Sequence, residues 1–205
     1  MTEQLQIEYL EGEEIGQRLE QIAALRLQVF SEWPYLYDGT MEEERACLRF
    51  YLKAPQALAI VLLDGDEVVG LSTAMPLTDE SPRLQAPFIE QGFDIGRVFY
   101  LAESILLPAY RGRGLYRHLF EARERHARNC GPYEWAAFCT VVRETDHDLR
   151  PAEYQSLEPI WAHFGYTRRD DLIAYYPWKQ VDEPEETDKP LVFWLKPLSE
   201  EASPS

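Results

Sequence analysis

Hydrophobic and polar positions follow two different periods along the chain, and the change of period predicts where strands and helices lie. Apolar residues at every second position predict a strand over 4–10, and apolar residues on one helical stripe predict a helix over 13–30. Residues 31–39 break the pattern, and Thr40 is a candidate N-cap for a second helix that runs to about residue 52. The N-terminal part is therefore predicted to be one strand followed by two helices.

The middle and the end of the chain predict a sheet with helices between its strands. Two β-rich runs around Asp64-Gly65-Asp66 predict a hairpin over 57–77. Apolar residues at both odd and even positions predict a central strand over 98–107 that is buried on both faces. The remaining predicted elements are a short helix around 83–91, a helix over 114–129, a strand over 134–142, a helix over 152–164, and strands over 171–178 and 190–198 joined by an acidic loop over 182–188. This order predicts one domain over 1–198, with a mixed α/β sheet of about seven strands and helices on both faces, and a disordered tail over 199–205.

Composition and charge narrow the class of protein. The 205 residues are 45% hydrophobic and 27% charged, the balance of a soluble globular protein, and the net charge is −16. That charge disfavours nucleic acid and anionic membrane surfaces as partners and favours cationic ones such as amines. The most apolar run, 57–63, is too short to span a bilayer, and the N-terminus lacks the pattern of a secretory signal, so we expect a cytoplasmic protein. The three cysteines and four histidines show no metal-ligand spacing, so no metal is expected.

One stretch of the chain has the opposite charge to the whole. Residues 111–128 hold six arginines and only two acidic residues. A positive patch in an acidic protein indicates an anionic ligand, and the alternative interpretation is a solvated helix face with salt bridges.

A tight glycine loop precedes this basic helix and favours the first interpretation. In the segment 98–119 a buried strand leads into the loop 110–114, which opens the helix. N–H groups at a helix N-terminus lack intrahelical acceptors and attract negative charge, and Gly112 and Gly114 allow the backbone to approach a phosphate. No Walker signature follows, and Arg117 replaces the third glycine of a dinucleotide fingerprint. The segment therefore predicts an anion site of another kind.

The run from Glu103 to Tyr116, ESILLPAYRGRGLY, resembles the acetyl-CoA motif of the GCN5-related N-acetyltransferase (GNAT) superfamily. The family signature is Arg/Gln-x-x-Gly-x-Gly/Ala after a strand and a proline, and the order of elements along nearly the whole chain is also similar. The resemblance implies a GNAT-like fold, acetyl-CoA as co-substrate, and transfer of its acetyl group by direct attack of a primary amine on a small molecule or peptide. By position it implies that pyrophosphate is held by Arg111, Gly112, Arg113, Gly114, Leu115 and Tyr116, and pantetheine by the backbone of Ile105 and Leu106.

Two positions depart from the family pattern. Tyr116 stands where the motif has Gly or Ala, so its side chain either turns away from the phosphates or narrows the site. The family often carries a tyrosine general acid in a Tyr-x-x-x-Gly-Phe pattern, and here the matching run begins with Trp161, whose indole cannot protonate a thiolate. Tyr154, His163 and water are the alternative proton donors, and we take Tyr154 as the candidate.

Glu103 is the candidate general base, because it lies on an otherwise apolar strand face, where desolvation raises the pKa of a carboxylate. The alternative is that Glu103 is paired with an arginine or capped by backbone amides. The resemblance also implies an acceptor pocket lined by the first two helices and the late hairpin. It makes Tyr35 and Tyr37, in the turn between those helices, the candidate acceptor-binding residues.

Three functions are compatible with this sequence. The first is an N-acetyltransferase, as a monomer or homodimer; the second is a non-catalytic acyl-CoA-binding or sensor domain, which Trp161 keeps open; the third is an acyltransferase for longer acyl chains. Release of CoA thiol on addition of candidate amines separates the first from the second.

Overall fold

The computed structural model describes residues 5–198, and its elements follow the predicted order. The strands are β1 (Gln6–Glu11), β2 (Leu58–Asp64), β3 (Glu67–Pro76), β4 (Val98–Tyr100), β5 (Ser104–Leu106), β6 (Trp135–Val141), β7 (Thr167–Lys179) and β8 (Glu186–Pro197). The α-helices are α1 (Leu19–Phe30), α2 (Met41–Lys53), α3 (Pro82–Glu90), α4 (Leu115–Cys130) and α5 (Glu158–His163). Short 3-10 helices are η1 (Gly12–Arg18), η2 (Leu77–Asp79), η3 (Ile95–Arg97) and η4 (Pro108–Tyr110). The predicted disordered tail, 199–205, lies outside the described residues.

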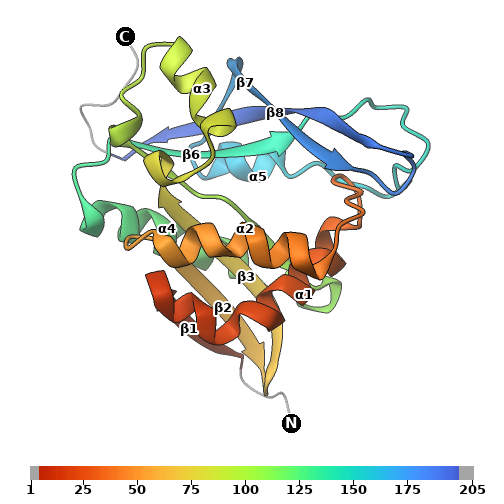
Figure 1. Cartoon of the computed structure of the whole chain (residues 1–205), viewed down its shortest axis with the longest axis horizontal. Helices are drawn as coiled ribbons and strands as arrows, with labels where there is room; N and C mark the ends of the chain where they lie inside the picture. The colour runs from red at the N-terminus through yellow and green to blue at the C-terminus, as the bar shows by residue number, and fades with distance from the viewer. Residues whose placement is uncertain (1–4, 199–205) are drawn as a thin grey trace.

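The strands form one mixed sheet in the order β1-β2-β3-β4-β6-β8-β7, with β5 paired to β3. Among the described strands, only β4 and β6 pair in parallel. In Figure 1, α1 and α2 lie in front of the β1–β3 part of the sheet and α4 lies behind it. The predicted mixed α/β sheet with helices on both faces is confirmed.

Strand β2 shows how the sequence builds these layers. Its alternate residues Ala59, Val61 and Leu63 pack with α1 and α2, while Leu58, Ile60 and Leu62 pack with α4. All six are almost completely buried, because a strand between two helical layers points successive side chains to opposite faces. The apolar run that could not span a bilayer is therefore a core strand.

The start of α2 follows the predicted capping chemistry. The Thr40 hydroxyl accepts a hydrogen bond from the Glu43 N–H (3.3 Å), and the Glu43 carboxylate accepts one from the Thr40 N–H (2.7 Å). This capping box satisfies donors that would otherwise be orphaned, and such a cap contributes about 1 kcal/mol. It also fixes where the loop before α2 ends, and that loop forms part of the site.

Three predicted elements have different bounds in the structure. The helix expected over 13–30 begins as the 3-10 helix η1 and becomes α-helical only at Leu19. The helix expected over 152–164 is reduced to α5, which begins at Glu158 and has Pro159 in its first turn. The acidic loop expected over 182–188 is shorter, because β8 already begins at Glu186.

The predicted central strand over 98–107 is correct in burial but wrong in continuity. It divides into β4 and β5 at residues 101–103, and this division accounts for the eighth strand. Pairing with β6 ends at Tyr100, with one further bond from the Leu101 N–H to the Ala137 carbonyl (2.7 Å), whereas β5 pairs with β3. A gap therefore separates β5 from β6.

A buried arginine forms hydrogen bonds with the backbone at the break in the strand. Arg123 of α4 is only 1% exposed, and its guanidinium donates to the backbone carbonyls of Glu103 (3.2 Å) and Thr73 (3.4 Å). The Glu103 carbonyl also accepts from the Thr73 N–H (3.0 Å) and the Ser72 hydroxyl (3.1 Å). With three donors on one carbonyl, the position of Glu103 is fixed from the backbone side.

Candidate active site

The glycine loop before α4 is held open by its backbone conformation. Gly112 (φ 73°) and Gly114 (φ 75°) both adopt the left-handed region, where any side chain is strained. A Cβ at either position would meet no atom within 4 Å. The hydroxyl of Tyr110 donates to Asp64 at the end of β2 (2.5 Å) and anchors the start of the loop. The space beside these two glycines is thus open.

The backbone N–H groups of residues 112–117 are the hydrogen-bond donors of this loop. Within residues 5–198, none of these six groups donates to a protein acceptor. They lie at the positive end of the α4 dipole, so the arrangement favours a phosphate group. This geometry is compatible with an anion at the loop, and the anion site stays a prediction.

The arginine patch contributes less positive charge to the loop than its sequence suggests. Arg123 is buried, and Arg128 pairs with Glu124 (3.5 Å). Arg117 is 3.9 Å from Glu121, and the Arg113 guanidinium lies over the Tyr110 ring, 4.8 Å from its centroid. Only part of the patch therefore faces solvent at the loop, and the backbone amides are the main donors.

The free edge of β5 leads from the glycine loop toward the break at Glu103. In the β3–β5 ladder, Leu107 donates to Val69 (3.0 Å) and Thr73 donates to Glu103 (3.0 Å). Because hydrogen-bonded pairs alternate in an antiparallel ladder, the backbone of Ile105 faces β3, and those of Ser104 and Leu106 face the gap. Of the predicted pair, Leu106 has its backbone groups toward the gap, whereas those of Ile105 are engaged with β3. The contact of either residue with pantetheine stays a prediction.

Two side chains occupy the carbonyls on this free edge. The Tyr116 hydroxyl donates to the Ser104 carbonyl (3.1 Å), and the Arg111 Nε donates to the Leu106 carbonyl (2.9 Å). Arg111 also pairs with Glu32 (3.2 Å). Both side chains point along the strand rather than into the loop. Of the two alternatives for Tyr116, the structure favours a side chain that turns away from the phosphate position.

A cavity of about 470 Å³ lies on the opposite face of the sheet, between α1, α2, the start of α3 and strands β7 and β8. Ala102 and Glu103, in the strand break, form part of its wall. Its charged lining residues are Asp38, Glu43, Glu44, Glu80, Glu103 and Glu186 against Arg26 and Lys179. Aromatic side chains, among them Phe30, Tyr51, Tyr100 and Trp178, cover much of the remaining wall. The cavity is therefore acidic and partly apolar.

Glu103 lies in a buried network of charges. Arg26 of α1 forms ion pairs with both Glu44 of α2 and Glu103, and the Tyr51 hydroxyl donates to Glu103 (3.4 Å). The Glu103 side chain is 10% exposed, at the cavity wall. The observed geometry matches the alternative in which Glu103 is paired with an arginine. Its role as general base stays a prediction.

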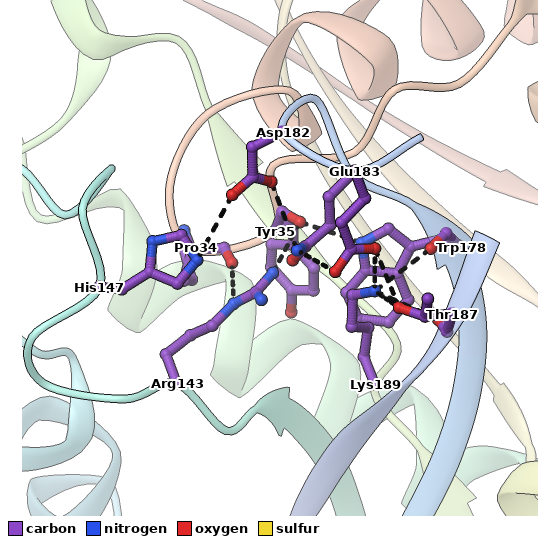
Figure 2. A network of polar contacts seen from close by, with 10 residues as sticks. Pro34, Tyr35, Arg143, His147, Trp178, Asp182, Glu183, Thr187 and Lys189 are labelled. Atoms are coloured by element: carbon purple, nitrogen blue, oxygen red, sulfur yellow. Dashed lines mark hydrogen bonds and ion pairs between the residues drawn. The ribbon is translucent and has the colours of Figure 1, made fainter. Parts of the chain in front are cut away.

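The turn between α1 and α2 is held against the far end of the sheet, as Figure 2 shows. Arg143 donates to the carbonyls of Pro34 (2.6 Å) and Tyr35 (2.9 Å), and the Trp178 indole N–H also donates to the Tyr35 carbonyl (3.0 Å). The candidate residues Tyr35 and Tyr37 both line the cavity, and burial raises the pKa of each phenol. The structure thus brings both of them to the site.

The candidate proton donors lie elsewhere. The Tyr154 ring packs edge-on against Trp33 (5.9 Å between centroids) and is not part of the cavity wall. His163 is exposed at the end of α5. Trp161 packs against Phe138 and Trp194, both at 5.3 Å, in the core on the α4 side. The role of Tyr154 as an acid stays a prediction.

Sequence reasoning missed most of the cavity wall. Arg26, Glu44, Glu80 and Tyr51 belong to segments that were predicted only as helices or irregular chain, and no local motif marks them. The signal that could have found them is a charged residue on the core-facing stripe of α1 or α2. Arg26 and Glu44 are such residues, and both are buried.

Two general properties of the described residues complete the picture. Over 5–198 the structure contains no helix that combines the length and apolar character needed to cross a membrane. In the same part of the chain, no group of three or more His, Cys, Asp or Glu side chains is arranged to hold a metal ion.

An anion at the N-terminus of α4 could continue along the free edge of β5 and meet the acidic cavity at Glu103. Helix N-termini bind phosphate groups, and small-molecule sites are concave with a few placed polar groups. The model of the acetyltransferase (GNAT) family matches residues 22–149, which contain the loop, the gap and most of the cavity wall. The chain belongs to the GNAT acetyltransferase family.

Solved structures agree on the fold at low sequence identity. The protein yncA from Salmonella typhimurium, solved with its cofactor acetyl-CoA, has a TM-score of 0.57 at 16% identity, covering 98% of each chain. NAA60 from Arabidopsis thaliana, in complex with a bisubstrate analogue, has a TM-score of 0.58 at 12% identity, covering 95% of this chain and 100% of that one. An N-acetyltransferase from Staphylococcus aureus has a TM-score of 0.57 at 14% identity, covering 96% and 99%. No curated protein sequence matches the chain.

Proposed function

We propose that this protein transfers an acetyl group from acetyl-CoA to a primary amine, which attacks the thioester directly. The observation that carries the proposal is the juxtaposition of two sites: six free N–H groups at the start of α4, and an acidic cavity that reaches the strand break from the other face. Family membership supports the activity, and the cavity supports an amine acceptor.

The residues at the loop and along β5 fit the shape and polarity of CoA. The amides of 112–117 would hold its pyrophosphate, and the open space above Gly112 and Gly114 would admit the phosphate oxygens. The N–H groups of Ser104 and Leu106 face the gap and would bind the carbonyls of the pantetheine arm. This chain holds the matching carbonyls with Tyr116 and Arg111, so those side chains must move if pantetheine is to use them.

The charge of the cavity selects for a cationic acceptor. Six carboxylates and two cationic side chains line it, so the wall attracts an ammonium group. Its aromatic residues suit an apolar body attached to that group. The proposed acceptor is therefore a small-molecule or peptide amine, and the acidic surface of the whole chain agrees with this choice.

Positioning would supply much of the rate, because the two sites meet at a rigid strand break. Acetyl-CoA supplies an acyl group that is activated as a thioester. The backbone N–H groups of Ala102 and Glu103 donate to no acceptor within residues 5–198, and they would polarise a carbonyl placed beside the break. Glu103 remains a predicted proton acceptor and Tyr154 a predicted proton donor.

Thiol release tests the proposal against a non-catalytic acyl-CoA-binding role, which Trp161 at the position of the usual acid would favour. The purified protein is incubated with acetyl-CoA and a panel of primary amines, and free CoA thiol is measured. We expect amine-dependent release that is lost when the glycine loop is altered. Tight acetyl-CoA binding without release for any cationic amine would favour the sensor role.

A further inference from the structure

Among the described residues, Glu80 is the carboxylate of the inner cavity wall, away from the exposed rim, that has no partner side chain. Within residues 5–198, four of the other cavity carboxylates are engaged: Glu44 and Glu103 by Arg26, Asp38 by Lys179, and Glu43 by the Thr40 cap. The Glu80 carboxylate forms no ion pair and no hydrogen bond with a side chain there. Glu186 also has no partner among the described residues, but it lies on the exposed rim of the cavity at the start of β8.

The backbone at Glu80 is fixed although its side chain is free. Its N–H donates to the Leu77 carbonyl (3.2 Å), which closes η2. Its carbonyl accepts from the Gln85 side-chain amide (2.7 Å), which ties it to α3. The carboxylate is therefore carried into the cavity wall by a rigid segment between β3 and α3.

The surroundings of Glu80 disfavour an unpaired negative charge. Burial raises the pKa of its carboxyl to about 7, and the negative charge of Glu103 acts in the same direction. The Ser81 backbone N–H and the charge of Arg26 act in the opposite direction. The titratable and charged groups near it, by element, are Arg26 (α1), Cys47 and Tyr51 (α2), Tyr100 (β4), Glu103, Cys139 (β6) and Tyr176 (β7). Arg26 is the one cation in this set, and Glu44 and Glu103 already engage it.

We propose that Glu80 is the carboxylate that receives the ammonium group of the amine acceptor, with the apolar body of the acceptor against the aromatic wall of the cavity. The inference rests on the proposed function, because it names the residue that recognises the substrate of that reaction. It assigns recognition of the ammonium group, and the proton lost before attack, to Glu80. Glu103, which holds Arg26, keeps its predicted role as acceptor of the proton lost after the amine has attacked.

The chemistry of a paired ammonium supports this assignment. A cation beside Glu80 would stabilise its ionised carboxylate, which the surroundings otherwise disfavour. The ammonium nitrogen would then be in contact with a group able to accept the proton that it must lose before attack. In that step one N–H bond breaks and one O–H bond forms, which leaves a neutral amine and a neutral carboxylic acid that later returns the proton to solvent.

Binding of 2-phenylethylamine, a probe with an ammonium group and an aromatic body, tests the proposal by calorimetry on the full chain. The proteins are wild type, Glu80→Gln, Glu103→Gln and the rim control Glu186→Gln, with 2-phenylethanol as the uncharged probe. We expect the amine, and not the alcohol, to bind wild type. Glu80→Gln should weaken it by roughly tenfold or more, and Glu186→Gln by less than about twofold, because a solvated charge contributes little.

Proton release separates recognition by Glu80 from a structural role. At pH 6 the free Glu80 carboxyl is mostly protonated, whereas the ammonium-bound form is ionised, so binding should release close to one proton. The number of protons follows from the binding heats in two buffers with different ionisation enthalpies. Wild type and Glu186→Gln should release the proton, and Glu80→Gln should not.

Several outcomes would overturn the inference. In the first, wild type does not bind the amine in the millimolar range. In the second, wild type and Glu80→Gln bind it equally. In the third, Glu103→Gln is the only variant that loses binding. Acetyl-CoA binding is measured on the same proteins. If acetyl-CoA fails to bind wild type, the proposed function fails while the amine result still decides the role of Glu80; if acetyl-CoA binds and the amine does not, only the inference fails.

Discussion

The two halves of the candidate active site are built from different parts of the polypeptide. The proposed CoA side uses main-chain groups from one continuous stretch, 104–117, and depends on backbone conformation at two glycines. The acceptor side uses side chains collected from residues 26 to 191, and depends on how their charges are paired. A backbone site is preserved by conformation, whereas a side-chain site can change its substrate through a few substitutions. The two halves should therefore respond differently to loss of charge.

The largest expected effect comes from the charge network of the cavity. Arg26→Met leaves Glu44 and Glu103 buried without their shared cation, so we expect the free energy of unfolding to fall by about 3–5 kcal/mol, measured by urea denaturation. The matched control removes all three charges, as Arg26→Met with Glu44→Gln and Glu103→Gln. It should recover most of the loss, and equal instability of the single and triple variants would show that packing, not charge, dominates.

The next effect depends on pH. The pKa of Glu80 is raised from 4.5 to about 7, so the folded protein keeps a proton that the unfolded chain loses, and stability falls as pH rises from 4.5 to 7. Glu80→Gln removes this slope. The variant should match wild type near pH 4 and exceed its free energy of unfolding by about 3 kcal/mol at pH 8. Parallel stability curves for the two proteins would contradict a raised pKa of the half-buried Glu80 carboxyl.

A smaller effect is expected on the CoA side. Tyr116→Phe removes the hydroxyl that occupies the Ser104 carbonyl, which should cost about 1 kcal/mol of unfolding free energy. The same carbonyl becomes available to pantetheine, so the dissociation constant of acetyl-CoA should fall by about fivefold. Calorimetry measures it, and weaker binding by the variant would mean that the Tyr116 hydroxyl contacts the ligand.

The sequence predicted the CoA side because its determinants are local. Gly112 and Gly114 mark the backbone conformation, and the basic helix follows directly, so a short motif contains the essential geometry. The predicted helices and strands also follow the order of elements along the chain in the structure. The strand break at 101–103 was not predicted, and neither was the orientation of the Ile105 backbone toward β3. Arg123 contacts this break from α4 and is 20 positions from Glu103 in sequence.

The cavity could be predicted only in part, because its determinants are distant in sequence. Tyr35 and Tyr37 were predicted from a turn next to two helices, and both line the wall. Glu80 lies in a segment without periodicity, and its environment is created by α1, α2, β4 and β7 together. The pairing of Glu103 with Arg26 joins residues that are 77 positions apart, and no local pattern reports such a contact.

Acetyl-CoA binding by calorimetry tests the central claim most directly, on wild type, Gly114→Glu and Gly65→Glu. Both glycines have positive φ and open space, so the two substitutions carry similar backbone strain, but Gly65 lies at the tip of the β2–β3 hairpin. We predict micromolar binding by wild type and Gly65→Glu, and a loss of at least about a hundredfold in Gly114→Glu, since a carboxylate would stand where the phosphate must lie. Absence of binding by folded wild type, or equal binding by all three proteins, would contradict the account.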